Sequence, residues 1–298
     1  MGPKMVFKRY ELKYLMDEEQ TAAVYRALSE HMALDGYGHS SIRNIYFDTE
    51  DFLLARRSIS KPMYKEKLRF RSYGAVERDG TVFVELKKKY DSVVYKRRLA
   101  MPLDEAMEWF SSPDAAGPHS QIGEEIGFLR RRYPGLHPAM LLTYEREAYY
   151  ARDGSDLRIT IDTNVQARLD DVDLTRGPGG HEVLPEGYTL MEIKTLYGYP
   201  PWLNRVLSGS RLYKSSFTKY GNAYKQMVVR RTPEDFLRIP NGADTVVGCG
   251  GDARWRRIAW PWPPSPWLPQ SPCWEASQHT PSPLTRARAG PPTRGWRR

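Results

Sequence analysis

Polar and hydrophobic residues alternate along much of the first 240 residues, in runs short enough to be β-strands. The alternation predicts eight strands, at roughly 5–15, 42–48, 63–73, 81–89, 93–100, 139–150, 156–166 and 188–196. Three other stretches repeat apolar side chains at helical spacing. The first begins at Asp17, with Gln20 placed as in a capping box, the second spans Gln121 to Arg132, and the third runs from about Pro200 to Gly209. The first part of the chain therefore combines strands and helices.

Charged side chains recur at every second position of these strands, and side chains two apart share one face of a strand. The third strand carries an unbroken cationic column: Lys65, Lys67, Arg69 and Arg71. The corresponding positions of the other strands are Arg9, Glu11, Lys13, Glu85, Lys87, Lys89, Lys96, Arg98, Tyr144, Arg146, Arg158, Thr160, Asp162, Glu192 and Lys194. Mainly apolar residues occupy the opposite faces of the fourth, seventh and eighth strands.

Two interpretations of the charged columns stay open for any single strand, since one such column is also typical of a solvated sheet face. For the whole set, facing rows of cations are destabilising unless an anion lies among them. We therefore predict an α+β fold built on a closed eight-stranded antiparallel β-barrel. Its charged columns would line a lumen for a long polyanion, and its helices would pack outside.

Acidic residues interrupt the cationic columns at Glu11, Glu85, Asp162 and Glu192. Carboxylates are the ligands that Mg²⁺ and Mn²⁺ prefer, usually one or two of them with substrate phosphates completing the shell. The alternative role is neutralisation of neighbouring cations, which is at least as good an interpretation for Glu85 beside Lys87. Glu192 is the stronger metal candidate, with Glu11 as the second.

Composition changes abruptly near residue 241. Six of the eight tryptophans, ten of the 23 prolines and both cysteines, Cys249 and Cys273, lie beyond it, with eight arginines against three acidic residues. We predict a tunnel domain at 1–232 and a disordered tail at 241–298. The tail also resembles a GC-rich message translated in a shifted reading frame, which sequencing of the DNA tests. The net charge of +9 is thus shared between tail and domain.

Other features narrow the class of protein. Without a run of roughly 18 apolar residues or an apolar leader, no membrane span is expected and a cytoplasmic location is the default. A Gly-rich phosphate loop and the kinase motifs are missing, so ATP would be bound in another way. Binding of nucleic acid through the basic tail would be unspecific.

Nine short segments together resemble the VTC (vacuolar transporter chaperone) domain of polyphosphate polymerases, within the triphosphate tunnel metalloenzymes. They are RYELKY at 9–14, IYFDT at 45–49, LRFRSYG at 68–74, VFVELKKK at 82–89, YKRR at 95–98, TYERE at 143–147, LRITID at 157–162, MEIKT at 191–195 and SFTKYGNAY at 216–224. Each is weak alone, but their order is that of the family. Eukaryotic members add a regulatory SPX domain and membrane helices, and we expect this chain to be the stand-alone bacterial form.

The resemblance implies roles for individual residues. The cations that would act on the transferred phosphate are Arg69, Arg71, Lys87, Arg146 and Arg158. The residues that would bind substrate are Lys13, Lys96, Tyr144 and Lys219, with Lys214 standing in for a basic residue that the family places closer to Lys219. We add Lys194 to this group from its strand column. Glu192 would hold Mn²⁺ or Mg²⁺, and we add Glu11 from its column.

The predicted function is transfer of the γ-phosphate of ATP to a growing polyphosphate, with release of ADP. The same tunnel could instead hydrolyse tripolyphosphate or a nucleoside triphosphate, and a tunnel closed at one end would favour hydrolysis. A non-catalytic polyphosphate-binding module would require loss of the metal carboxylate, whereas Glu192 is retained. ATP and inorganic polyphosphate are the expected partners, and the sequence identifies no protein partner.

Overall fold

A computed structural model describes residues 10–91, 93–112, 115 and 117–230. The predicted tail at 241–298 lies outside the described residues, as do Arg9 and the start of the first predicted strand. None of the helices within these ranges is long and apolar enough to cross a membrane.

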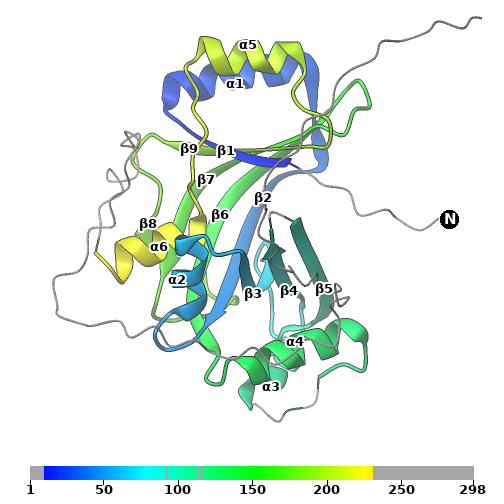
Figure 1. Cartoon of the computed structure of the whole chain (residues 1–298), viewed down its shortest axis with the longest axis vertical. Helices are drawn as coiled ribbons and strands as arrows, with labels where there is room; N and C mark the ends of the chain where they lie inside the picture. The colour runs from blue at the N-terminus through cyan, green and yellow to red at the C-terminus, as the bar shows by residue number, and fades with distance from the viewer. Residues whose placement is uncertain (1–9, 92, 113–114, 116, 231–298) are drawn as a thin grey trace, which may run out of the picture. The chain divides into compact units, whose positions relative to one another are not determined.

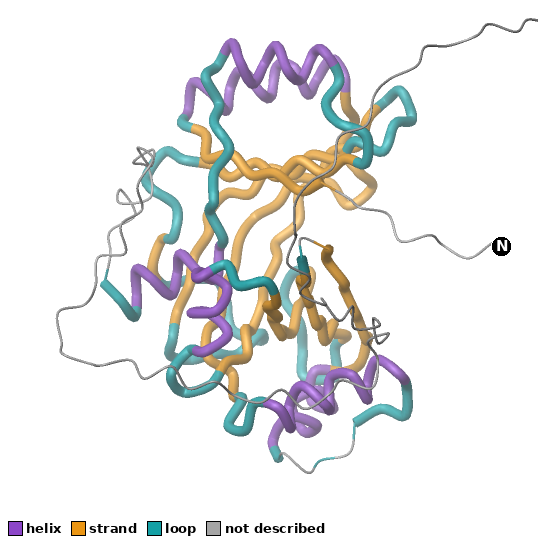
Figure 2. The backbone as a smooth tube through the Cα atoms, viewed as in Figure 1, coloured by secondary structure: helices purple, strands orange, loops and turns teal. Residues whose placement is uncertain are grey.

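One antiparallel sheet organises the described chain (Figures 1 and 2). The elements in sequence order are β1 (Tyr10–Met16), α1 (Glu18–His31), β2 (Met32–Asp48), α2 (Leu53–Ser60), β3 (Tyr64–Tyr73), β4 (Thr81–Tyr90), β5 (Val93–Pro102), α3 (Leu103–Ser111), α4 (Gln121–Arg132), β6 (His137–Ala151), β7 (Arg158–Arg168), β8 (His181–Glu182), β9 (Thr189–Thr195), α5 (Pro201–Gly209) and α6 (Lys219–Met227). The strand order is β1-β9-β7-β6-β2-β3-β4-β5, and β8 pairs with β7.

The three predicted helices are confirmed. Asp17 accepts a hydrogen bond from the Gln20 backbone, and the Gln20 side chain accepts one from the Asp17 backbone, so the capping box of α1 is complete. The second predicted helix is α4, which has the predicted bounds and Ser120 as its N-cap. The third is α5, which begins with a proline, as predicted.

Helices α2, α3 and α6 were missed, and α2 shows why its start is hard to see in the sequence. The side chain of its N-cap residue, Phe52, forms no hydrogen bond with the helix, and the Phe52 backbone adopts a left-handed conformation. The backbone N–H groups of Leu54 and Ala55 instead donate to the carboxylate of Asp48, at 2.7 and 2.8 Å. The capping carboxylate therefore lies outside the local pattern that marks a helix start.

The predicted closed barrel is wrong, although the α+β class is right. Strands β1 and β5 end the strand order, and no ladder joins them in the described chain. The segment after α5 bonds to β1: Lys214 forms a bridge with Tyr14, and the Ser215 N–H donates to the Lys13 carbonyl at 2.7 Å. Because these bonds use part of the β1 edge, that edge is not free to pair with β5.

The open sheet nevertheless curves strongly. Lys87 Nζ on β4 lies 3.5 Å from Glu11 Oε2 on β1, although six steps of the strand order separate these strands. Side chains of the two ends of the sheet therefore meet over one face.

Hydrophobic cores lie on both faces of the sheet. On one face, β1, β9 and β7 bury Met16, Ile159 and Ile193 against α1 and α5, while β2, β3 and β4 bury residues such as Phe70 and Leu86 against α3 and α4 (Figure 1). The third core lies on the opposite face, under α6. The three predicted helices thus pack on the uncharged side, and α6, which was not predicted, packs on the charged side.

Candidate functional site: a charged sheet face

Register places the predicted charged columns on one face of the sheet. Partners across the ladders are Lys13 and Glu192, Arg69 and Glu85, and Arg146 and Asp162. We call the face that carries these six residues the charged face. Its charges gather into two clusters around buried carboxylates.

Glu85 is the centre of the first cluster. Its side chain is 2% exposed and accepts hydrogen bonds from Arg69 Nη2 and Arg98 Nε, both at 2.7 Å. Lys96 Nζ lies 2.7 Å and Arg71 Nε 3.9 Å from its oxygens. Burial raises the pKa of Glu85, but Arg69, Arg71 and Lys96 outweigh burial, and the pKa is held far below its ordinary value. One buried carboxylate thus faces four cations.

Asp162 and Glu192 form the second cluster. Arg146 donates to both Asp162 oxygens, at 2.6 and 2.7 Å, and Lys219 Nζ bonds to Asp162 Oδ2 as well. Glu192 Oε1 lies 3.1 Å from Lys13 Nζ and 3.2 Å from Lys219 Nζ. Against the effect of burial, these cations hold the pKa of Asp162 and of Glu192 below the ordinary values. Both carboxylates are therefore ionised in the folded protein at neutral pH.

Tyr144 lies between the two clusters. Arg71 Nη2 donates to its hydroxyl oxygen at 3.0 Å. Lys219 Nζ and Arg146 Cζ lie 4.5 and 5.1 Å from the centre of its ring. Burial raises the pKa of Tyr144, whereas Arg71, Arg146 and Lys219 lower it, and the result is about 8. The Tyr144 side chain thus contacts cations from both clusters, Arg71 at its oxygen and Lys219 and Arg146 at its ring.

The sequence prediction overlooked two residues that position the arginines. Asn44 Oδ1 accepts from Arg71 Nε at 2.9 Å, and Tyr46 accepts from Arg69 Nη1 at 3.0 Å. Tyr46 stacks on Tyr220 of α6, with ring centroids 4.3 Å apart. Both residues alternate with the apolar residues of β2, and this period of two was the available signal.

The remaining candidates lie toward the margins of this face. Lys87 is half-exposed beside Glu11, and Lys194 Nζ is 3.8 Å from Glu192 Oε2. Arg158 is exposed, with its guanidinium 5.3 Å from the Tyr150 ring centre. Lys214 is exposed at the edge of β1, and among the described residues no ion pair joins it to either cluster. The fold thus brings the predicted residues together, apart from Lys214.

Cations exceed carboxylates in the two clusters. Glu85, Asp162 and Glu192 face eight cations: Lys13, Arg69, Arg71, Lys96, Arg98, Arg146, Lys194 and Lys219. Such an excess, partly removed from water, favours binding of an anion with several charges.

A family model, the VTC domain, matches residues 8–228, well over half of the chain. The chain belongs to the VTC domain family. The resemblance predicted from the nine short segments is thereby confirmed. A search of curated proteins found no match.

Solved structures similar to this VTC domain protein are more distant. A candidate adenylate cyclase from Bacillus halodurans is 16% identical, with 70% of this chain and 92% of that chain covered and a TM-score of 0.45. A protein from Pyrococcus horikoshii is also 16% identical, with 74% and 99% covered and a TM-score of 0.40. A candidate adenylate cyclase from Vibrio parahaemolyticus is 12% identical, with 75% and 98% covered and a TM-score of 0.38.

A divalent metal would find only part of its coordination shell in this VTC domain. No three His, Cys, Asp or Glu side chains converge on one point within the described residues. Glu192 fits a partial shell, because it is buried and ionised on the charged face. Across the β7–β9 ladder lies Thr160, whose buried Oγ1 has no hydrogen-bond partner in the described part of the chain. Since Mg²⁺ often takes one or two carboxylates plus substrate phosphates, the donor set suits a metal that arrives with phosphate.

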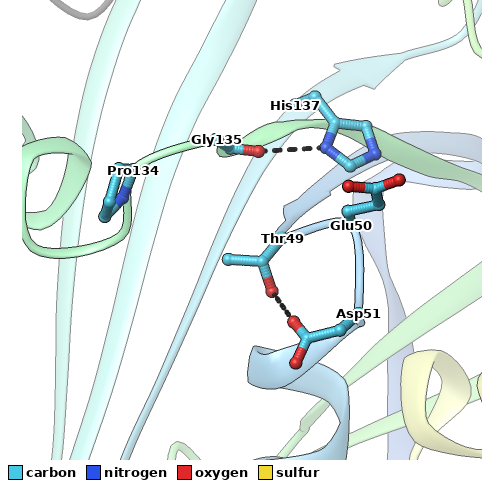
Figure 3. A pocket seen from close by; sticks show the side chains of 6 residues that line it. All are labelled: Thr49, Glu50, Asp51, Pro134, Gly135 and His137. Atoms are coloured by element: carbon cyan, nitrogen blue, oxygen red, sulfur yellow. Dashed lines mark hydrogen bonds between the residues drawn. The ribbon is translucent and has the colours of Figure 1, made fainter.

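A separate pocket lies between the turn after β2 and the turn before β6 (Figure 3). Glu50, Asp51 and His137 line it, together with Thr49, Pro134 and Gly135. The lining contains two carboxylates and neither lysine nor arginine, and Arg56 pairs with Asp51, so no surplus of cations is available there for a phosphate chain.

The low pKa of Tyr144 predicts a pH dependence. Below about pH 8 the phenol is neutral. Above this pH the negative phenolate offsets part of the positive charge of Arg71, Arg146 and Lys219, which then attract a further anion less strongly. The affinity of the VTC domain for tripolyphosphate is therefore expected to fall between about pH 7 and about pH 9. Because the folded-state pKa lies below the ordinary value of 10, ionisation also adds stability that is present above pH 10 and lost as pH falls through 8.

Isothermal titration calorimetry at both pH values, with Tyr144→Phe as the comparison, measures this effect. The Phe variant is expected to lose the part of the pH dependence that belongs to the phenol. An equal fall in affinity in both proteins would show that Tyr144 is not the titrating group.

Proposed function

We propose that this chain is a polyphosphate polymerase, which transfers the γ-phosphate of ATP to the end of a polyphosphate chain and releases ADP. The observation that carries the proposal is the convergence of Arg71, Arg146 and Lys219 on the Tyr144 phenol. At this point two cation-rich clusters come within reach of one phosphate group. Membership of the VTC domain family supports the same function.

The transfer demands placement and charge neutralisation more than covalent chemistry from the protein. A terminal oxygen of the acceptor chain attacks the γ-phosphorus, and the bond from this phosphorus to the bridging oxygen breaks. The electron pair of that bond leaves with ADP. Arg71, Arg146 and Lys219 would bind the non-bridging oxygens and so favour the in-line approach.

The acceptor needs no strong base, because a terminal phosphate of a polyphosphate is already ionised at neutral pH. The charged face agrees with this requirement: its carboxylates are bound to cations, which makes them poor proton acceptors. Glu192, with Glu11 nearby, would hold Mn²⁺ or Mg²⁺, and such an ion supplies further charge neutralisation to the phosphates.

Hydrolysis is the second candidate, and the position of α6 favours it. Tyr220 and Ala223 of α6, with Phe217 just before the helix, pack on apolar residues of the charged side of the sheet, such as Leu142 and Leu190. Helix α6 therefore covers part of this side and restricts the directions in which a chain can leave. A face covered in this way suits short chains, with water as the nucleophile.

Separation of the products of ATP turnover distinguishes the two functions. The full chain is incubated with ATP and Mn²⁺ or Mg²⁺, and the products are resolved on a gel that separates long polyphosphate from free phosphate. We expect ADP and long polyphosphate, and loss of both in Glu192→Gln. Free phosphate as the sole phosphate product would favour hydrolysis, and absence of ATP turnover would contradict the polymerase.

A further inference from the structure

A strip of lysines continues the charged face beyond the Glu85 cluster. Lys65 and Lys67 extend the column of β3 past Arg69, and Lys87 and Lys89 extend that of β4 past Glu85. Lys65 is paired with Lys89, and Lys67 with Lys87. We call these four residues the lysine strip. At about 3.3 Å per residue, it reaches roughly 13 Å from Arg69 to Lys65.

Little negative charge offsets the lysine strip. Lys87 pairs with Glu11 at 3.5 Å, and Lys65 Nζ donates to the Ser58 carbonyl at 3.0 Å. In the described part of the chain, Lys67 and Lys89 form no ion pair. Like charges directly opposite one another destabilise an antiparallel ladder.

Lys67 is the least compensated member of the strip. It faces Lys13 from β1, Lys87 from β4 and its own neighbours on β3, and its Nζ lies 5.9 Å from the centre of the Tyr220 ring of α6. Burial first, and then these cations, lower the pKa of Lys67 well below its ordinary value. An anion among the strip would raise this pKa again.

The opposite face of the same strands shows how an ordinary charged surface is arranged. Lys88 Nζ and Arg97 Nε both lie 3.0 Å from the carboxylate of Glu125 on α4. Glu66 is buried there but accepts hydrogen bonds from two tyrosines. Charges on that face are matched within the protein, whereas in the described part of the chain only Lys87 of the lysine strip has an ion pair.

We propose that the lysine strip is a second phosphate-binding segment, which holds the body of a long polyphosphate chain while its end lies at Tyr144. The inference rests on the proposed function and adds the path of the chain, along β3 and β4 toward α2. A chain of bare phosphates suits the half-buried lysines better than a nucleic acid, whose sugars and bases would have to enter between Lys67 and α6.

Binding of two probes to matched variants tests the path. The probes are tripolyphosphate and a long polyphosphate, titrated by calorimetry into the full chain. The test variant is Lys65→Gln/Lys67→Gln, and the control is Lys88→Gln/Arg97→Gln, which removes the same charge from the opposite face. Melting temperatures are measured in parallel, and Lys89→Gln serves as a single-site variant.

Wild type is expected to bind the long chain more tightly than tripolyphosphate. The test variant should keep its tripolyphosphate affinity within about twofold but lose about tenfold in affinity for the long chain. Lys89→Gln should show a smaller loss of the same kind, and the control variant should bind both probes as wild type does. The test variant should melt at the wild-type temperature or above, because like charges have been removed.

Long-chain affinity at the wild-type level in the test variant would overturn the lysine strip and leave the proposed function standing. The inference would also be overturned, with the proposed function left standing, if single-stranded RNA displaced long polyphosphate as well as polyphosphate itself does. The strip would then be a general polyanion surface. If wild type binds neither tripolyphosphate nor long polyphosphate, the proposed function is overturned, and this inference with it.

Discussion

Replacement of Glu85 by glutamine is expected to destabilise the ligand-free protein by about 3 to 5 kcal/mol, because a buried carboxylate that faces several cations is lost. Glutamine keeps the shape of the side chain but leaves Arg69, Lys96 and Arg98 facing one another without an anion. Denaturant unfolding of the variant and of wild type measures the difference.

Glu125→Gln is the matched control, since Glu125 also binds two cations from β4 and β5. Its side chain is 23% exposed, compared with 2% for Glu85. Water can therefore solvate Lys88 and Arg97 when the Glu125 carboxylate is removed, which offsets much of the lost ion-pair energy. We expect a change below about 1 kcal/mol.

Tripolyphosphate should restore part of the stability that Glu85→Gln loses, because the ligand supplies the missing negative charge. The ligand-induced rise in melting temperature is therefore expected to be larger in this variant than in wild type. Equal losses in Glu85→Gln and Glu125→Gln would mean that the Glu85 cluster is an ordinary solvated set of ion pairs.

Arg71→Ala is expected to lower turnover by roughly 10- to 100-fold, the cost of one charge-assisted hydrogen bond to the transferred phosphate. Stability should fall by less than in Glu85→Gln, because Arg71 is the most distant of the four cations around Glu85, at 3.9 Å, and the loss comes mainly from its hydrogen bonds to Asn44 and Tyr144. Steady-state turnover of ATP and thermal unfolding without ligand measure the two effects separately.

Arg97→Ala provides the control for this variant, since Arg97 binds Glu125 on the opposite face of the sheet. Its turnover should stay within about twofold of wild type, as expected for a surface ion pair. Wild-type turnover in Arg71→Ala would place the reaction away from Tyr144 and contradict the proposed mechanism.

The charged face was predictable because it depends on a period of two along each strand. Once Lys13, Arg69, Glu85 and Arg146 are assigned to strands, their side of the strand follows, and antiparallel pairing brings them together. The family resemblance added Lys219, which lies on a helix that the strand pattern did not reveal.

Closure of the sheet and the place of α6 were not predictable, because both depend on contacts between distant residues. Tyr220 donates to Asp48, 172 residues earlier, at 2.6 Å, and this bond ties α6 to the end of β2. The bridge between Tyr14 and Lys214 joins residues separated by nearly the whole domain. Local periodicity contains no information on either contact, and so the alternation of charged residues suggested a closed barrel.

The position of bound tripolyphosphate in a crystal of the full chain tests the central claim most directly. We expect its phosphates to contact Arg71, Arg146 and Lys219 beside Tyr144, with Lys13 and Lys219 drawn from Glu192 toward the ligand. Tripolyphosphate on the opposite face of the sheet, with the ion pairs of Glu85, Asp162 and Glu192 unchanged, would contradict the claim that the charged face is the phosphate site.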